Sequence, residues 1–322
     1  MLTHGFDSLN FPFRFLYLWR YTVKKRDVIK TTVSCYLFIV PAAVFFIVFI
    51  AYPVFFTIYG SFFNWSSLAN MKFIGIGNYI DLFKDKVFFT AARNALYWIL
   101  ITVFIQMVLG FSLAYIIEEK LFYNKPFFRT LFFIPVVTSV VAIAIVFKNM
   151  FSPYQGLITN ALYKIGLKGP FNWLGDYKSA IFAVIGVNIW EWTGWSMLLY
   201  VAGLSQISTD IREAVEIDGV SEIKKIFAIY VPLLSSVHKT LIMLGIIGSL
   251  QTFALVYTMT SGGPNSASEM PGTYIFKAGF RMQKMGYASA VSVVVLLTAL
   301  LLTIRQVVSF GSGNVKNKRN AA

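Results

Sequence analysis

The chain has 322 residues, of which 57% are hydrophobic and 13% are charged, and its formal net charge is +14. Ordinary soluble domains carry about 25% charged residues. A chain with half that share lacks the charge to cover a soluble surface of this size. The composition therefore excludes an ordinary soluble globular protein, and we expect much of the surface to face lipid.

Apolar residues gather in six long stretches. A helix needs about 20 apolar residues to cross the hydrocarbon core, where it must satisfy its own backbone hydrogen bonds. None of the stretches shows the polar face at helical period that a helix on a soluble protein would show. The sequence predicts an all-α integral membrane protein with about six transmembrane helices, over roughly 33–59, 95–117, 131–150, 179–203, 233–257 and 287–308.

One transmembrane domain, residues 33–308, would take up most of the chain. A basic arm (1–32) in the cytoplasm or at the membrane interface would precede it, and a basic cytoplasmic tail (309–322) would follow it. The arm shows no basic segment followed by an apolar run and a cleavage site, so we expect the first span to direct insertion. Cys35, the single cysteine, lies in that span, and we expect it to have a packing role.

The distribution of basic residues predicts the orientation. An even number of spans puts both termini on one side, and seventeen of the 28 lysines and arginines would lie on that side. Because positive residues favour the inner side, we expect a multi-pass protein of the cell membrane with both termini in the cytoplasm. The cations flank hydrophobic spans and no nucleic-acid motif accompanies them, so membrane lipid explains the net charge better than nucleic acid.

A segment with helical signals, STDIREAVEIDGVSEIKKIFAIYVPLL (208–234), lies between the fourth and fifth stretches. We call it the elbow. Asp210 and Glu213 have the spacing of a capping box, which predicts the start of a helix. Ile211, Ala214 and Val215 would lie on one face of that helix.

A turn and a second helix would complete the elbow. The Asp218-Gly219 pair predicts the turn, and Ser221 would cap the second helix. Pro232 would open the next span. An apolar stripe on the second helix would consist of Ile223, Phe227 and Tyr230.

The elbow, with Glu213-Ala214, Asp218-Gly219 and Pro232 in this order, resembles the EAA loop of ABC importer permeases. Val215, Val220 and Val231 stand where that pattern often has Ala, Ala and Leu. Further segments resemble the binding-protein-dependent sugar permeases of the subfamily that contains the larger maltose-type permease. In order, they are FIGIGNYIDLF (73–83), PFFRTLFFIPVV (126–137), FNWLG (171–175) and TSGGP (260–264). The resemblance covers about residues 35–308.

In that family the elbow is a coupling helix that docks in a cleft of a cytoplasmic ATPase subunit. The resemblance therefore implies a coupling role for Glu213, Ala214, Asp218 and Gly219. It also implies a heterodimer with a second homologous permease, two ATPase subunits, an extracytoplasmic solute-binding protein and a sugar, either a di- or an oligosaccharide. The sequence has no GxxxxGK[ST] run and no His/Cys cluster. We therefore expect a transport subunit that is not an enzyme and has no cofactor, with ATP and Mg on the ATPase subunits.

Polar residues gather inside the fourth and fifth stretches, in NIWEWTGWSMLLY (188–200) and GSLQTF (248–253). Polar groups inside spans are costly and usually face a cavity or the interior of the bundle. Aromatic rings suit the apolar faces of pyranoses, and polar side chains suit their hydroxyls. The resemblance places a sugar site on these two spans. It implies a substrate pathway that includes Glu191, Trp192, Thr193, Ser196, Ser249, Gln251 and Thr252.

Other roles for these residues stay open. The serines and threonines could bond only to neighbouring helices, and the tryptophans could form an interfacial belt. Glu191 could bond a sugar hydroxyl, pair with a cation or lie at the outer interface. The outer loops carry more cations than carboxylates, which suits an acidic oligosaccharide and an acidic binding protein equally.

A self-sufficient secondary transporter or channel is the rival class. Such proteins usually show internal repeats or buried ionisable relays. The two halves of this sequence show no convincing repeat, and Glu191 is the one candidate relay.

Overall fold

The computed structural model describes residues 38–120, 123–167, 169 and 171–320, with side chains up to residue 308. The predicted basic arm (1–32) and Cys35 lie outside the described residues. The chain divides into two units, Met1–Thr57 and Ile58–Ala322, and each is described by itself.

The described part of the first unit belongs to one helix, which ends at Gly60. From Phe38 this helix passes through a π-helical turn, η1 (Ile47–Ala51), into α3 (Tyr52–Gly60). The turn ends two residues before Pro53, which has no N–H to donate to the preceding turn of the helix. The helix has 23 residues, and the mean hydropathy of an 18-residue stretch within it is 2.5. It is therefore long and apolar enough to cross a membrane.

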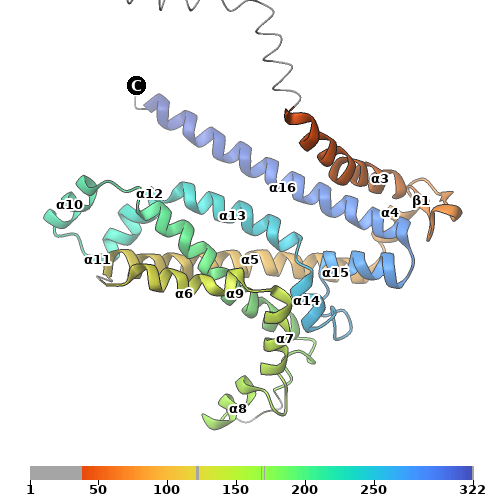
Figure 1. The fold of residues 1–322 in the computed structure, drawn as a ribbon, viewed down its shortest axis with the longest axis horizontal. Helices are drawn as coiled ribbons and strands as arrows, with labels where there is room; N and C mark the ends of the chain where they lie inside the picture. The colour runs from red at the N-terminus through yellow and green to blue at the C-terminus, as the bar shows by residue number, and fades with distance from the viewer. Residues whose placement is uncertain (1–37, 121–122, 168, 170, 321–322) are drawn as a thin grey trace, which may run out of the picture. The chain divides into compact units, whose positions relative to one another are not determined.

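The second unit is almost entirely helical (Figure 1). Two short antiparallel strands, β1 (Phe63–Asn64) and β2 (Lys72–Phe73), place Phe63 opposite Phe73, with the 3-10 turn η2 (Leu68–Asn70) between them. The helices in chain order are α4 (Gly77–Leu82), α5 (Lys86–Tyr115), η3 (Ile116–Lys120), α6 (Lys125–Val137), α7 (Val140–Met150), α8 (Leu157–Lys164), α9 (Ala180–Leu204), α10 (Thr209–Ile217), α11 (Glu222–Lys224), η4 (Lys225–Tyr230), α12 (Val231–Leu233), α13 (Ser235–Leu250), α14 (Ala254–Met259), α15 (Pro271–Phe276), η5 (Lys277–Arg281) and α16 (Met285–Asn320).

The predicted helical membrane architecture is confirmed, but several predicted spans differ in detail. Among the described residues, three helices are long and apolar enough to cross a membrane, or up to five if each bent pair counts as one span. The 131–150 stretch bends by 90° between α6 and α7, and the 233–257 stretch breaks after α13. α9 is 25 residues long but is not among these spans, because polar residues in its middle lower its hydropathy. The count of six stays a prediction.

Two boundaries also differ from the sequence-based expectation. α5 starts at Lys86 and not near residue 95, because the Asp85 side chain accepts hydrogen bonds from Val87 N (2.8 Å) and Phe88 N (3.4 Å) and so caps the helix. At the other end of the chain, α16 continues as a helix into the predicted tail, as far as Asn320.

Close packing of α9 against two neighbours organises the unit, and α5, α6 and α9 run side by side (Figure 1). A Cβ added at Gly110 of α5 would lie 2.6 Å from the Cβ of Ser196. A Cβ added at Gly194 of α9 would lie 2.0 Å from the carbonyl oxygen of Phe132 on α6. Helices in membranes approach closely where such small residues meet, so these glycines fix the position of α9.

Two buried clusters fill the space around α9. One surrounds Trp98, Val184 and Met259 and joins α5, α7, α9 and α14. The other surrounds Tyr200, Tyr230 and Leu234 and joins α5 and α9 to the end of the elbow. Each cluster therefore supports one of two candidate sites, a cavity beside α9 and the elbow beyond it.

Candidate functional site

The elbow is two short helices joined by a tight turn. α10 and α11 are separated by Gly219, whose φ of +62° lies in the left-handed region that favours glycine. The predicted turn at Asp218-Gly219 is confirmed. The predicted capping box is wrong: α10 starts after Ser208, so Asp210 lies inside its first turn and no side chain caps the helix.

The predicted apolar faces are only partly correct. On α10, Val215 is buried, whereas Ile211 and Ala214 are exposed. On the second helix, Tyr230 is fully buried, whereas Ile223 and Phe227 are about 70% exposed. Three large apolar residues of the elbow are the most exposed, and we call them the elbow face: Ile217, Ile223 and Phe227.

An ion cluster fastens the elbow to the end of α5. Glu119, in η3, accepts a charged hydrogen bond from Arg212 of α10 and another from Lys225 of η4 at 3.3 Å. Tyr230 also donates to Glu119, at 3.2 Å. Only 9% of the Glu119 side chain and 10% of the Lys225 side chain are exposed. One carboxylate therefore holds both helices of the elbow, and we call this set the clamp: Glu119, Arg212, Lys225 and Tyr230.

Neighbouring carboxylates make separate contacts at the same end of α5. Glu222 of α11 accepts hydrogen bonds from Lys120 at 2.6 Å and from Tyr115. Glu118 pairs with Arg129 of α6 at 2.6 Å and does not contact the elbow. Sequence reasoning missed these residues. The only signal was the run Glu118-Glu119-Lys120 at the end of an apolar stretch, and it does not name its partners.

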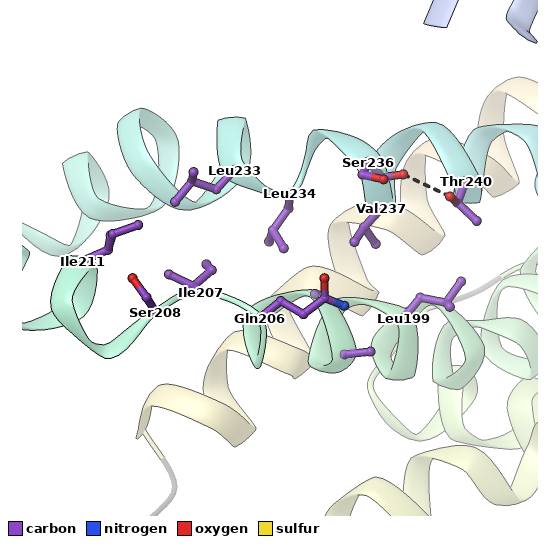
Figure 2. A pocket seen from close by; sticks show the side chains of 12 residues that line it. Leu199, Gln206, Ile207, Ser208, Ile211, Leu233, Leu234, Ser236, Val237 and Thr240 are labelled. Carbon is purple, nitrogen blue, oxygen red and sulfur yellow. Dashed lines mark hydrogen bonds between the residues drawn. The ribbon is translucent and has the colours of Figure 1, made fainter. Parts of the chain in front are cut away.

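A groove of about 470 Å³ lies next to the elbow (Figure 2). The side chains of Ile207 and Ile211 face Leu233 and Leu234 across it. Its floor is tight, because a Cβ added at Gly203 would lie 2.6 Å from Val237. The groove lies between the α9–α10 segment and the α12–α13 segment. These two segments are the connections between the elbow and the rest of the bundle.

A second and larger cavity, of about 540 Å³, lies between α5, α9 and α13, and we call it the chamber. Six of the seven predicted pathway residues line it: Glu191, Trp192, Ser196, Ser249, Gln251 and Thr252. Thr193 is buried outside the lining, and its hydroxyl donates to the Ile189 carbonyl at 2.6 Å. Asn188 and Trp195 complete the α9 side.

α5 supplies a wall of the chamber that sequence reasoning did not include. Trp98, Thr102 and Gln106 line it, one helical turn apart. The Gln106 amide donates to the Asn188 backbone carbonyl at 3.1 Å and to its side-chain oxygen at 3.2 Å, which ties α5 to α9. Gln106 was visible as a polar residue inside an apolar stretch, and that was the signal available.

Two of the chamber hydroxyls bond to backbone carbonyls four residues earlier in the chain. Ser249 donates to the Gly245 carbonyl at 2.6 Å, and Thr252 donates to the Gly248 carbonyl at 3.0 Å. Bonding between helices is therefore not what holds these two residues in place. Their oxygen atoms stay able to accept a hydrogen bond from a ligand.

Glu191 differs from the other polar residues of the chamber. It is only 3% exposed, and its Oε2 atom has no hydrogen-bond partner in the described part of the chain. This burial argues against the outer-interface alternative. An unpaired buried carboxyl oxygen is costly unless something else contacts it.

The comparisons with known proteins identify the family. The family model "Binding-protein-dependent transport system inner membrane component" matches residues 106–310. A probable ABC transporter permease protein of Bacillus subtilis, YurN, is 38% identical, and the match covers 86% of this chain and 96% of YurN. The lactose transport system permease protein LacF of Rhizobium radiobacter is 34% identical, with 85% of this chain and 93% of LacF covered.

A solved structure shares the fold. A chain of a bacterial alginate ABC transporter, in complex with an alginate-bound periplasmic protein, matches with a TM-score of 0.77 and 21% identity. The match covers 88% of this chain and 96% of that chain. This chain belongs to the family of inner-membrane components of binding-protein-dependent transport systems. It is a membrane-embedded transport subunit.

Proposed function

We propose that the chain is the permease subunit of an ATP-driven importer and forms half of the pathway for a di- or oligosaccharide. The observation that carries the proposal is the chamber between α5, α9 and α13, which combines exposed indoles with neutral polar groups. Trp192 and Trp195 offer faces for the C–H surfaces of a sugar ring. Asn188, Gln251 and Glu191 offer partners for its hydroxyls. Relatives named for lactose, arabinooligosaccharides and multiple sugars support this class of cargo.

The elbow is the proposed docking site for an ATPase subunit. Glu213, Ala214, Asp218 and Gly219 lie on α10 and its turn, next to the elbow face. An exposed apolar set flanked by charges suits a partner surface better than water. The assembly would contain two ATPase subunits that hold ATP and Mg, a second homologous permease and an extracytoplasmic binding protein. A structural neighbour solved with a periplasmic protein supports the last of these.

The elbow and both termini would then lie in the cytoplasm. Residues 33–308 would form the transmembrane domain, between the basic arm and the basic tail. The count of basic residues on each side supports this orientation.

Transport would follow from a shift between outward-facing and inward-facing states. ATP can shift this equilibrium only if the docked ATPase subunits favour one state over the other. The clamp gives the path within this chain, because it joins the elbow to α5, and α5 lines the chamber. Movement of the elbow would therefore reach the cavity through one continuous helix.

Gly219→Leu tests the proposal. A Cβ at Gly219 would meet no atom of this chain within 4 Å, so inside the chain the substitution costs only the strain of a positive φ, about 1–2 kcal/mol. A side chain there would instead project toward a docked subunit. We expect lactose or arabinooligosaccharide uptake to be lost from cells while the amount of protein in the membrane stays the same.

Gly166→Leu is the matched control, since Gly166 also has a positive φ, with open space around it, and lies in the loop after α8. It should leave uptake intact. Full uptake by the Gly219→Leu variant would contradict the docking role. Uptake by the purified chain alone in vesicles would favour a self-sufficient transporter.

A further inference from the structure

Among the described residues, Glu191 is the only ionisable side chain that lines the chamber. No lysine, arginine or histidine contributes to the lining within the part of the chain that the structure describes. The carboxyl group is buried, and one of its oxygens is unpartnered. The chamber thus presents one acid and no basic group to whatever enters it.

Several of the neutral groups around Glu191 share this bias. The hydroxyl hydrogens of Thr102, Ser249 and Thr252 are taken up by backbone carbonyls four residues earlier in the chain, at 2.8, 2.6 and 3.0 Å. These residues therefore meet a ligand as hydrogen-bond acceptors. The Gln106 amide is likewise engaged by Asn188.

We propose that this chamber selects sugars that present hydroxyl or ammonium donors and excludes sugars that carry a carboxylate or sulfate, with Glu191 as the group that sets the preference. The inference rests on the proposed import function and specifies its cargo. If Glu191 is ionised, it repels an anion across a cavity of low polarity. If it is protonated, an anion that has left water still finds no cation here to replace its hydration.

The cations of the outer loops do not alter this preference, because they lie outside the chamber lining. They suit an acidic face on a binding protein or lipid headgroups. A structural neighbour is described as involved in import of the acidic polysaccharide alginate. That neighbour is 22% identical to this chain, so the likeness carries the fold and not the cargo.

Tryptophan fluorescence of the assembled transporter, without its binding protein, tests the inference. Trp98, Trp192 and Trp195 line the chamber, so a bound sugar should alter their emission. The probes are maltotriose, the glucosamine trisaccharide and trigalacturonate, each titrated into the tens of millimolar. We expect trigalacturonate to bind at least tenfold more weakly than the tighter of the other two.

Variants assign the preference to one side chain. Glu191→Gln should weaken the tighter probe about tenfold, since the amide nitrogen that replaces one carboxyl oxygen cannot accept a hydrogen bond from the probe. Glu191→Lys should reverse the order and favour trigalacturonate. Glu118→Gln removes a carboxylate outside the chamber and should keep the wild-type order. If the glucosamine trisaccharide binds more tightly than maltotriose, and Glu191→Gln abolishes that difference, the selected donor is the ammonium group. If the two sugars bind equally well, the selected donor is the hydroxyl group.

Equal binding of trigalacturonate and maltotriose by the wild type would overturn the inference, and so would an unchanged order in Glu191→Lys. Binding of none of the three by a transporter that still takes up lactose would also overturn it, while the import function would stand. Loss of both binding and uptake would count against both proposals.

Discussion

Replacing the clamp carboxylate should uncouple ATP hydrolysis from transport. Glu119 holds one cation from each helix of the elbow, so Glu119→Gln removes the charge that both share. The substitution keeps the size and an acceptor oxygen, which limits the packing change. Arg212 and Lys225 would then lie close together without a shared counter-charge.

The burial of the clamp sets the size of the effect. Removing one partner of a buried ion pair costs about 3–5 kcal/mol, and the exposed pairs of a surface contribute about 0–1 kcal/mol. Glu119 and Lys225 are about nine-tenths buried, whereas 27% of the Arg212 side chain is exposed. We therefore expect a loss of about 3 kcal/mol, which raises the fraction of elbows detached from α5 about a hundredfold.

The matched control is Glu118→Gln. Glu118 is the preceding residue and is similarly buried, but its partner Arg129 lies on α6 and is 35% exposed. This variant removes a neighbouring ion pair that does not involve the elbow, so it shows how much coupling changes when the clamp stays intact. It should change the stability of the transporter by about 1 kcal/mol and its coupling very little.

The assay measures sugar uptake and ATP hydrolysis in the same proteoliposomes, with all subunits and the binding protein present. We expect uptake per ATP to fall at least tenfold in Glu119→Gln and to stay within about twofold of wild type in Glu118→Gln. The swap of Glu119→Lys with Lys225→Glu re-forms one ion pair between η3 and η4 but places the new lysine against Arg212, so it should restore only part of the loss. Equal ratios in the two single variants would refute the role of the clamp.

Two further predictions concern stability. Gly194→Ala would place a Cβ 2.0 Å from a carbonyl oxygen of α6 and should lower the melting temperature of the transporter by several degrees. Gly186 lies on the same helix with open space around it, so Gly186→Ala should have little effect. Asp85 is partly buried, which alone would raise its pKa, but hydrogen bonds from two tyrosines and the start of α5 outweigh burial and lower the pKa. The ionised Asp85 side chain therefore stabilises the fold above a pH of about 4, and this stabilisation is lost as the pH falls through the lowered pKa. Below a pH of about 4, the melting temperature of Asp85→Asn should vary less with pH than that of the wild type.

The helices could be predicted because the membrane imposes a simple rule. An apolar stretch must be a helix in lipid, and Gly219 after Asp218 marks a turn by local chemistry alone. Breaks inside apolar stretches could not be predicted in this way. The 90° bend between α6 and α7 leaves the composition apolar on both sides, so hydropathy carries no trace of it.

The α9 side of the chamber could be predicted more sharply than it was. Asn188, Glu191, Trp192 and Trp195 follow the spacing i, i+3, i+4, i+7 of a single helix face, and all four line the cavity. Thr193 lies about 200° around the helix from Glu191 and points elsewhere. The resemblance suggested Thr193, and helical period would have excluded it.

The clamp could not be predicted, because its partners lie far apart in the sequence and nothing local pairs Glu119 with Arg212 or Lys225. Its place at the end of α5 nevertheless decides how the elbow can act. Moving a two-state equilibrium from 1:99 to 99:1 takes about 5.5 kcal/mol of preference. If the clamp broke during the cycle, about 3 kcal/mol of the ATPase contribution would be spent on separating the elbow from α5. The clamp is therefore expected to persist in both states, so that the elbow and α5 move as one body and the bending occurs elsewhere, at the turn between α12 and α13 or beyond α13 at Gln251.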